Sequence, residues 1–164
     1  MATKSARIGL VSDSHGDFVA LLRAYRCMGS IDLLIHAGDH FRDGKRLSEQ
    51  LDLPVIAVAG NCDRGIGPCD ELVELFGLRF FITHGHTMAV KVGTRELVAV
   101  AARYKCDVVV YGHTHVPKIF DERGILFVNP GSVSYPRQGS APSYGMIEIA
   151  EGRAVAEIFE LAKG

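Results

Sequence analysis

Short runs of apolar, mostly β-branched residues alternate with segments of helical periodicity over much of the chain. Runs that lack alternating polar positions are typical of strands buried on both faces. We expect such strands at Arg7–Val11, Asp32–Ala37, Val55–Ala59 and Asp107–Tyr111. Apolar residues at helical spacing predict helices at Phe18–Met28, with Asp17 as the cap, at Asp43–Leu51, and from the cap Thr94 to Tyr104.

Pairs of apolar segments separated by turn residues predict three hairpins. The pairs are Glu71–Phe76 with Arg79–Thr83, Pro117–Asp121 with Ile125–Val128, and Tyr144–Ala150 with Arg153–Phe159. Strand–helix–strand units imply parallel pairing, whereas hairpins add antiparallel strands. The combination predicts an α/β fold of four layers, an α-β-β-α sandwich in which two mixed β-sheets lie face to face with helices outside. No linker divides the sequence, so we expect one domain over residues 1–164.

Composition narrows the functional classes without selecting one. The formal net charge is −1, so no basic balance argues for nucleic acid or a membrane as the partner. Four scattered cysteines, Cys27, Cys62, Cys69 and Cys106, are predicted to be free thiols of a reducing compartment. Because no apolar run suits a signal peptide or a membrane span, we expect a cytoplasmic protein. Strand edges and the last hairpin offer surfaces for a homo-oligomer.

Side chains that can bind metals follow the ends of the predicted strands. The set is Asp13, His15, Asp39, Asn61, His84, His86, His113 and His115, and it holds five of the seven histidines. Side chains two residues apart in an extended segment project to the same side, so His113 and His115 are expected to reach one point in space. The carboxyl ends of strands are the usual place for ligands in an open α/β sheet.

The chemistry of this set favours borderline divalent ions. Imidazoles mixed with oxygen ligands, without a thiolate, suit Mn²⁺, Fe²⁺, Zn²⁺, Ni²⁺ or Co²⁺ better than Ca²⁺. Eight donors exceed what one such ion binds, whereas two ions about 3.5–4 Å apart that share a carboxylate would use them. Structural interpretations remain for single residues. Asp13 could cap a helix, and Asp39 and Asn61 could sit in turns. His84 and His113 could be strand-end side chains bonded to backbone groups.

Five motifs follow one another in a fixed order along the chain. They are D-S-H at 13–15, G-D at 38–39, G-N-C-D at 60–63, H-G-H at 84–86 and G-H-T-H at 112–115. In this order they resemble the calcineurin-like metallophosphoesterase superfamily. The short chain and the G-N-C-D variant resemble its small bacterial and archaeal phosphodiesterase branch, in which the run N-P-G-S at 129–132 also occurs.

This resemblance implies a phosphoesterase that depends on two divalent metal ions. The implied ligands are Asp13, His15 and His115 for one ion, Asn61, His84 and His113 for the other, and Asp39 as the bridge between them. A hydroxide that bridges the ions would attack phosphorus in line with the leaving group. Asp39, Asn61 and His86 are the implied catalytic residues. Arg64 and His86 are expected to hold the phosphate oxygens of a small phosphoester substrate.

One departure from the family pattern concerns proton donation to the leaving group. Many members have a histidine where this chain has Cys62. A thiol with a pKa of about 8.5 could donate a proton there, although a small side chain packed under the loop is the simpler interpretation. Nitrophenyl diesters, which have good leaving groups, are therefore the expected preferred substrates. Of the other histidines, His36 is expected in the core or behind the ligands, and His40 fits either a substrate edge or solvent.

Two other functions fit the same sequence. The first is a phosphomonoesterase. The second is a non-catalytic scaffold that binds proteins, like the retromer subunit of this fold. That subunit has lost several of the ligands, whereas this chain keeps all seven, which favours the enzyme.

Overall fold

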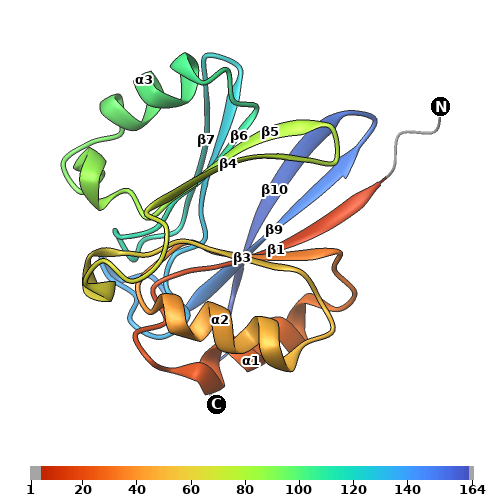
Figure 1. The fold of residues 1–164 in the computed structure, drawn as a ribbon, viewed down its shortest axis with the longest axis vertical. Helices are drawn as coiled ribbons and strands as arrows, with labels where there is room; N and C mark the ends of the chain where they lie inside the picture. Colours follow the sequence, from red (N-terminus) through yellow and green to blue (C-terminus); the bar gives the residue numbers. More distant parts are fainter. Residues whose placement is uncertain (1–4, 163–164) are drawn as a thin grey trace.

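The computed structural model describes residues 5–162, which form two β-sheets with helices on their outer faces (Figure 1). The helices are α1 (Phe18–Met28), α2 (Phe41–Gln50) and α3 (Arg95–Arg103), with short 3-10 turns at Asn61–Asp63 and His86–Met88. The strands are β1 (Ala6–Val11), β2 (Leu33–His36), β3 (Val55–Ala57), β4 (Asp70–Leu75), β5 (Leu78–Thr83), β6 (Val108–Val110), β7 (Lys118–Glu122), β8 (Ile125–Asn129), β9 (Ser143–Ala150) and β10 (Arg153–Glu160).

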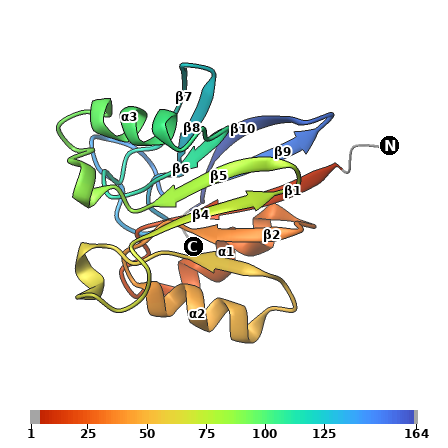
Figure 2. The same cartoon turned by 45° about the horizontal axis from the view of Figure 1, so that its top comes forward.

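Both sheets are mixed and have five strands each, in the orders β10-β9-β1-β2-β3 and β4-β5-β6-β8-β7. Strands β1, β2 and β3 are parallel, and the hairpin of β9 and β10 adds two antiparallel strands beside β1. In the second sheet β5, β6 and β8 are parallel, with β4 and β7 antiparallel at the edges. The predicted α-β-β-α sandwich is confirmed, since α1 and α2 cover one sheet and α3 the other (Figure 2).

Apolar side chains fill three layers between these elements. The main core lies between the two sheets and includes the fully buried Ile8 and Ile82. Leu21 of α1 and Leu47 of α2 belong to the layer outside the first sheet, and Leu97 of α3 to the layer outside the second. The central strands are therefore covered on both faces, which explains why their sequences are continuous apolar runs.

The element boundaries match the prediction to within two residues, and β3, for example, ends at Ala57 instead of Ala59. Helix α1 has the predicted bounds, and Asp17 Oδ1 accepts a hydrogen bond from the Ala20 amide at 2.9 Å. Helix α2 begins at Phe41, two residues early, because Asp63 Oδ1 accepts from the Phe41 amide at 2.8 Å. Thr94 makes no side-chain hydrogen bond at the start of α3. Its ψ of 4° differs from the extended backbone that a capping hydroxyl usually requires.

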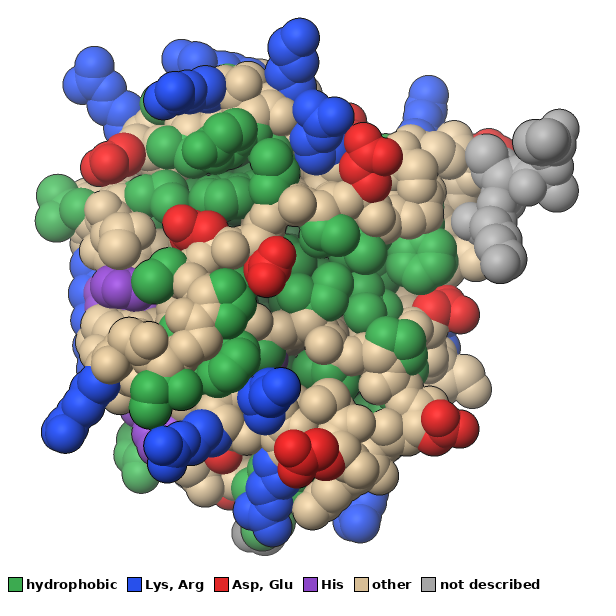
Figure 3. Space-filling view, in the orientation of Figure 1, with side chains coloured by type: hydrophobic (Ala, Val, Ile, Leu, Met, Phe, Trp, Pro, Cys, Tyr) green, Lys and Arg blue, Asp and Glu red, His purple; other side chains and the backbone are tan. Residues whose placement is uncertain are grey.

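The edge strands β3 and β4 lie near each other, on a face where apolar side chains gather (Figure 3). A cavity of about 390 Å³ between them is lined by Val55, Ile56 and Val73, among others. None of its lining residues belongs to the predicted ligand set. The predicted ligands instead follow the carboxyl ends of the parallel strands, whose loops gather on the left in Figure 1.

Two expectations from composition can also be compared with the structure. All four cysteines are free thiols, as predicted. Within residues 5–162, none of the helices has the length and apolar character needed to cross a membrane.

Candidate metal centre

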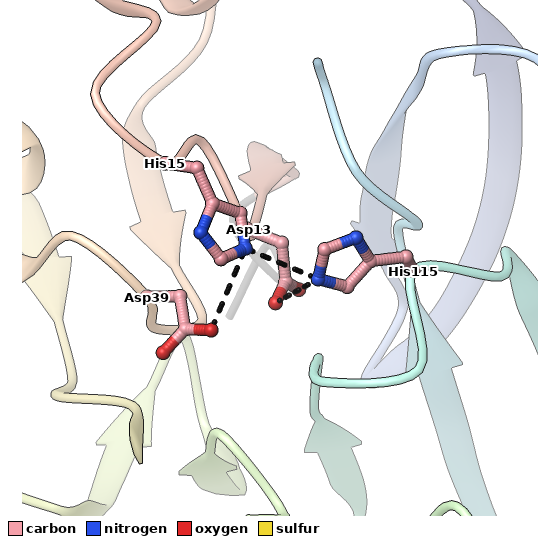
Figure 4. Close-up of side chains that lie close together, drawn as sticks. All are labelled: Asp13, His15, Asp39 and His115. Carbon is pink, nitrogen blue, oxygen red and sulfur yellow. Dashed lines mark hydrogen bonds and ion pairs between the residues drawn. The ribbon is translucent and has the colours of Figure 1, made fainter. Parts of the chain in front are cut away.

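Four of the predicted ligands come together where three strands end. Asp13 and His15 follow β1, Asp39 follows β2, and His115 follows β6. Each offers one nitrogen or oxygen atom, and these atoms all lie within 4.8 Å of one another (Figure 4). His15 Nε2 lies 3.1 Å from His115 Nε2 and 3.5 Å from Asp39 Oδ2. Two carboxylates and two imidazoles at this spacing form a donor set that a borderline divalent ion can use.

The backbone of the ligand loops is unusual. Five of the seven predicted ligands have positive φ, namely Asp13 (53°), His15 (46°), Asp39 (53°), His113 (71°) and His115 (59°). Residues other than glycine adopt this left-handed conformation rarely, and such positions tend to cluster at functional sites. The loops thus turn sharply just after their strands, which directs the side chains into a common space.

The expectation that His113 and His115 reach one point from an extended segment is wrong. Strand β6 ends at Val110, and both histidines follow in the left-handed conformation. The His115 ring lies 4.9 Å from that of His15, whereas the His113 ring lies 5.0 Å from that of His84. The pair therefore supplies one imidazole to each of two neighbouring groups.

Backbone carbonyls fix the orientation of two imidazoles. His115 Nδ1 donates to the Tyr135 carbonyl at 2.5 Å, and His84 Nδ1 donates to the Ala37 carbonyl at 2.8 Å. A carbonyl can only accept, so the hydrogen of each neutral ring lies on Nδ1 and the lone pair on Nε2. Both Nε2 atoms face the other ligands. This arrangement, in which a second hydrogen bond orients a ligand histidine, is common in metal sites.

Around His84 Nε2 the structure places oxygen atoms that carry lone pairs and no hydrogen, so none of them can donate a hydrogen bond. Asn61 Oδ1 is 3.2 Å away, Asp39 Oδ2 3.4 Å and Asp13 Oδ1 3.7 Å. Asp13 Oδ1 is buried and accepts no hydrogen bond from the described residues. Such a group of lone pairs needs a positive charge at its centre, and a metal ion would supply it. The residues present therefore fit the cation that the sequence predicts.

When no metal is bound, a proton on His84 would meet part of this need. Burial would lower the pKa of His84, but its contact with Asp39 and the charge of Asp13 raise that pKa above its usual value. Burial would likewise raise the pKa of both carboxyls. The His115 and His84 contacts lower that of Asp13, and the His84 contact lowers that of Asp39. Both carboxylates thus stay ionised at neutral pH.

His113 and His86 lie beside His84 and form, with Asn61, a second group of predicted site residues. Burial, helped by the charges of His84 and Lys91, lowers the pKa of His113 to about 4. The imidazole is therefore neutral at pH 7, which is the form that binds metals. The His86 ring lies 5.4 Å from that of His84 and 6.1 Å from that of His113. Its Nδ1 is buried and has no hydrogen-bond partner among the described residues.

Comparisons with known proteins agree with this geometry. Residues 6–152 match the calcineurin-like phosphoesterase superfamily domain. The chain belongs to this family. It is 32% identical over 154 residues to a probable metallophosphoesterase of Mycoplasma pneumoniae. The alignment covers 90% of this chain and 92% of that protein. It is 33% identical over 171 aligned positions to the phosphodiesterase YfcE of Escherichia coli K12, with 87% of each protein covered.

Solved structures support the family assignment. A predicted phosphoesterase from Streptococcus pneumoniae has a TM-score of 0.83 and 32% identity over 99% of this chain and 96% of its own. Vps29 of Cryptosporidium parvum has a TM-score of 0.73 at 19% identity, over 97% of this chain and 99% of its own. At that identity the likeness concerns the fold alone.

The remaining predicted site residue, Arg64, lines a cavity beside the candidate metal centre. Arg64 is exposed, and it lines this cavity of about 400 Å³ together with His40 and Cys62. The Cys62 amide donates to Asp39 Oδ1 at 3.0 Å. Burial and the neighbouring Asp39 raise the pKa of the Cys62 thiol to about 11. The thiol is therefore a poor proton donor at neutral pH. The alternative expectation, a side chain packed under the loop, is wrong, because the Cys62 side chain is exposed.

A hydrogen-bond network lies behind the ligands. It includes His36, which was expected there or in the core, together with Ser14 and Asp43, which the sequence did not indicate. Ser14 Oγ donates to Asp43 Oδ2 at 2.7 Å and contacts His36 Nε2 at 3.0 Å, while the Gly16 amide donates to the same carboxylate oxygen at 3.1 Å. The Gly38 amide donates to His36 Nδ1 at 3.3 Å, which leaves the ring hydrogen on Nε2, facing Ser14. The network ties α2 to the loop between the first two predicted ligands.

The family run N-P-G-S at 129–132 has a role of the same kind. Ser132 Oγ donates to the Asp13 carbonyl at 2.7 Å, and Ser134, two residues beyond the run, donates through its Oγ to the Ser14 carbonyl at 2.9 Å. The run could have been noticed as a motif, but its target is more than a hundred residues earlier in the chain. Only the packed loops reveal that it supports the backbone of the first ligand.

Proposed function

We propose that this protein is a dimetal-dependent phosphodiesterase. The observation that supports it best is the convergence of four ligand atoms, from Asp13, His15, Asp39 and His115, within 4.8 Å of one another. Nothing in an ordinary core requires two buried carboxylates beside two imidazoles that are oriented by backbone carbonyls. Such a group would serve catalysis by holding cations, because cations stabilise the negative charge that develops on the phosphate oxygens during the reaction.

Seven residues would hold the two ions. One ion would be bound by Asp13, His15 and His115, the other by Asn61, His84 and His113, with Asp39 between them. The place of Asp39 supports this division, since its Oδ2 lies 3.5 Å from His15 Nε2 and 3.4 Å from His84 Nε2. Asn61 contributes a neutral carbonyl oxygen, which limits the negative charge of the site to that of two carboxylates.

When bound, two divalent ions would acidify a water molecule for in-line attack on phosphorus and offset the charge of the phosphate. The protein's own groups would orient the substrate. His86 stands beside His84 and His113 and can donate a hydrogen bond to a phosphate oxygen. Arg64 lies at the rim and can approach the phosphate from the cavity that it shares with Cys62. Ligand loops with fixed, left-handed backbone would keep these groups in place before substrate binds.

A diester is the preferred substrate class. The relative YfcE, which covers 87% of this chain, is named a phosphodiesterase. Two ions and two carboxylates leave a positive site that attracts a phosphodiester monoanion. The Cys62 thiol, a weak acid here, would help little with a poor leaving group, so nitrophenyl esters are expected to react faster than alkyl esters.

Hydrolysis of bis-(p-nitrophenyl) phosphate and p-nitrophenyl phosphate, each with Mn²⁺ or Ni²⁺, tests this proposal. The wild type should hydrolyse the diester faster than the monoester, and a chelator should abolish the activity. Asp39→Ala should lower kcat/KM by at least about 100-fold. Asp52→Ala, which changes an exposed carboxylate away from the site, serves as the matched control.

Two results would contradict the proposal in different ways. Faster hydrolysis of the monoester would identify a phosphomonoesterase. A protein that binds metal, hydrolyses neither ester and is unaffected by Asp39→Ala would favour the scaffold that binds other proteins.

A further inference from the structure

Two cavities open beside the candidate metal centre and meet at His40. One, of about 430 Å³, is lined by His15, His40, His115, Tyr135, Pro136 and Arg137. The other, of about 400 Å³, is lined by His40, Arg42, Cys62, Asp63, Arg64 and Ile66. Each is large enough for a small organic group. A phosphate at the metal centre would have space for one substituent on either side of His40.

The first cavity is lined mainly by rings. The His15 ring lies 4.9 Å from that of His115, 5.5 Å from that of Tyr135 and 5.7 Å from that of His40. Tyr135 is a large side chain with 58% of its surface exposed, although it stands next to a buried site. Its ring meets His15 at 83°, edge to face, so one of its faces is left for another partner.

The cavity wall is fixed to the metal centre by the backbone. The Tyr135 carbonyl accepts from His115 Nδ1 at 2.5 Å, and the Arg137 amide donates to the His115 carbonyl at 3.2 Å. Ser140 Oγ donates to the Arg137 carbonyl at 2.6 Å, which holds the turn closed. The guanidinium of Arg137 forms no ion pair with an acid among residues 5–162, so it remains available to an anion.

We propose that this cavity binds a planar aromatic group of the substrate, such as the base of a nucleoside, against the ring of Tyr135. The inference rests on the proposed phosphodiesterase function and specifies the chemical class of one ester arm. Stacking on an aromatic side chain suits any flat π-system, and Arg137 beside it can contact the phosphate or a further anionic group.

The geometry assigns the arm that stays on phosphorus to this cavity. In an in-line displacement the leaving oxygen departs opposite the attacking water, so with water activated at the metal centre it would lie on the far side of phosphorus. His15 and His115 form both part of the metal centre and part of the cavity wall. A group that runs along these histidines lies beside phosphorus, off the line of displacement, and is therefore retained in the product.

The kinetic test uses two diesters that release the same leaving group. Thymidine 5′-(p-nitrophenyl) phosphate carries a nucleoside as the retained arm, and methyl p-nitrophenyl phosphate carries a methyl group. The wild type should prefer the nucleoside diester by about tenfold or more in kcat/KM. Tyr135→Ala should remove most of this preference, because kcat/KM should fall far more for the nucleoside diester than for the methyl diester. Tyr135→Phe, which keeps the ring, should retain it.

Binding measurements separate this inference from the proposed function. Isothermal titration with thymidine 5′-monophosphate and with methyl phosphate, both in the presence of Mn²⁺, should show the same preference and the same loss in Tyr135→Ala. A protein that binds the nucleotide in this manner but hydrolyses no diester would contradict only the proposed function.

Hydrolysis of both diesters without a preference, or a preference that survives Tyr135→Ala, would overturn the subsite. An equal loss on both diesters would also overturn it, since Tyr135 would then act on the metal centre itself.

Discussion

Ser14, His36 and Asp43 are buried behind the ligands and hold the loop that carries Asp13 and His15. Ser14→Ala removes the hydroxyl that both His36 Nε2 and Asp43 Oδ2 contact. Unpaired buried groups of this kind cost about 1–3 kcal/mol. We expect the free energy of unfolding to fall by that amount in urea denaturation. Mn²⁺ affinity should fall about 10–100-fold by isothermal titration.

Ser48→Ala provides the control for this substitution. Ser48 Oγ donates to the Lys45 carbonyl on the exposed face of α2, far from the ligands. Its loss should change neither Mn²⁺ affinity nor stability by a comparable amount. Unchanged Mn²⁺ affinity in Ser14→Ala would mean that the ligand loop is held without the network.

The burial of His36 predicts that the stability of the folded protein depends on pH. Burial lowers the pKa of this histidine from 6.5 to about 4, and the charge of Asp43 offsets this only in part. The unfolded chain therefore binds a proton here below pH 6.5, whereas the folded protein does so only below about pH 4. The free energy of unfolding should fall by about 3 kcal/mol through this window as the pH decreases. In His36→Asn, urea denaturation of the metal-free protein should show a smaller fall. An equal fall in both proteins would exclude His36 as its source.

The sequence predicts which residue types form the candidate site better than it predicts the directions of their side chains. The ligand types were predictable because carboxylates and imidazoles recur after strands in motifs of fixed order. Their directions were not, because the left-handed φ of His113 and His115 carries no local signal and sends the two rings to different groups. Asp43 could not be found either, since its partner Ser14 lies 29 residues away on another element.

At the scale of elements, the close approach of two loops explains one glycine of the G-N-C-D motif. A Cβ on Gly60 would lie 2.1 Å from Asp39 Oδ1 and 2.6 Å from the Asp39 amide nitrogen. Gly60→Ala must therefore push the loop after β3 away from the loop after β2. We expect loss of Mn²⁺ affinity of about 10–100-fold, measured by titration, with a corresponding loss of diesterase activity.

The matched control is Gly93→Ala, because a Cβ at Gly93 meets no atom within 4 Å. This variant should bind Mn²⁺ and hydrolyse the diester like the wild type. If Gly60→Ala also behaves like the wild type, the proposed contact between Asp39 and the second ligand loop is wrong.

Helices and strands themselves followed from the periodicity of apolar residues. Turn residues defined the hairpins, and burial on both faces produced continuous apolar runs. The pairing of β9 with β1 could not be predicted from the sequence, because these strands lie at opposite ends of the chain and the last hairpin could have joined either sheet. The start of α2 depended on Asp63, a carboxylate from a distant loop.

For the whole molecule, metal binding should appear as stability. A ligand that binds only the folded state at a hundredfold excess over its Kd adds about 2.7 kcal/mol. For a chain of this length that corresponds to a rise in Tm of about 5–10 °C. We expect EDTA to lower the Tm of the Mn²⁺-loaded protein by this amount in differential scanning calorimetry. The Tm of Asp39→Asn should shift much less. If EDTA does not change the Tm of the wild type, a preformed metal site is contradicted.

Anomalous diffraction from crystals soaked with Mn²⁺ tests the paired metal centre most directly. Two peaks about 3.5–4 Å apart are expected. One should contact Asp13, His15 and His115, the other Asn61, His84 and His113, and both should contact Asp39. A single peak, or peaks that bypass Asp39, would contradict the paired metal centre.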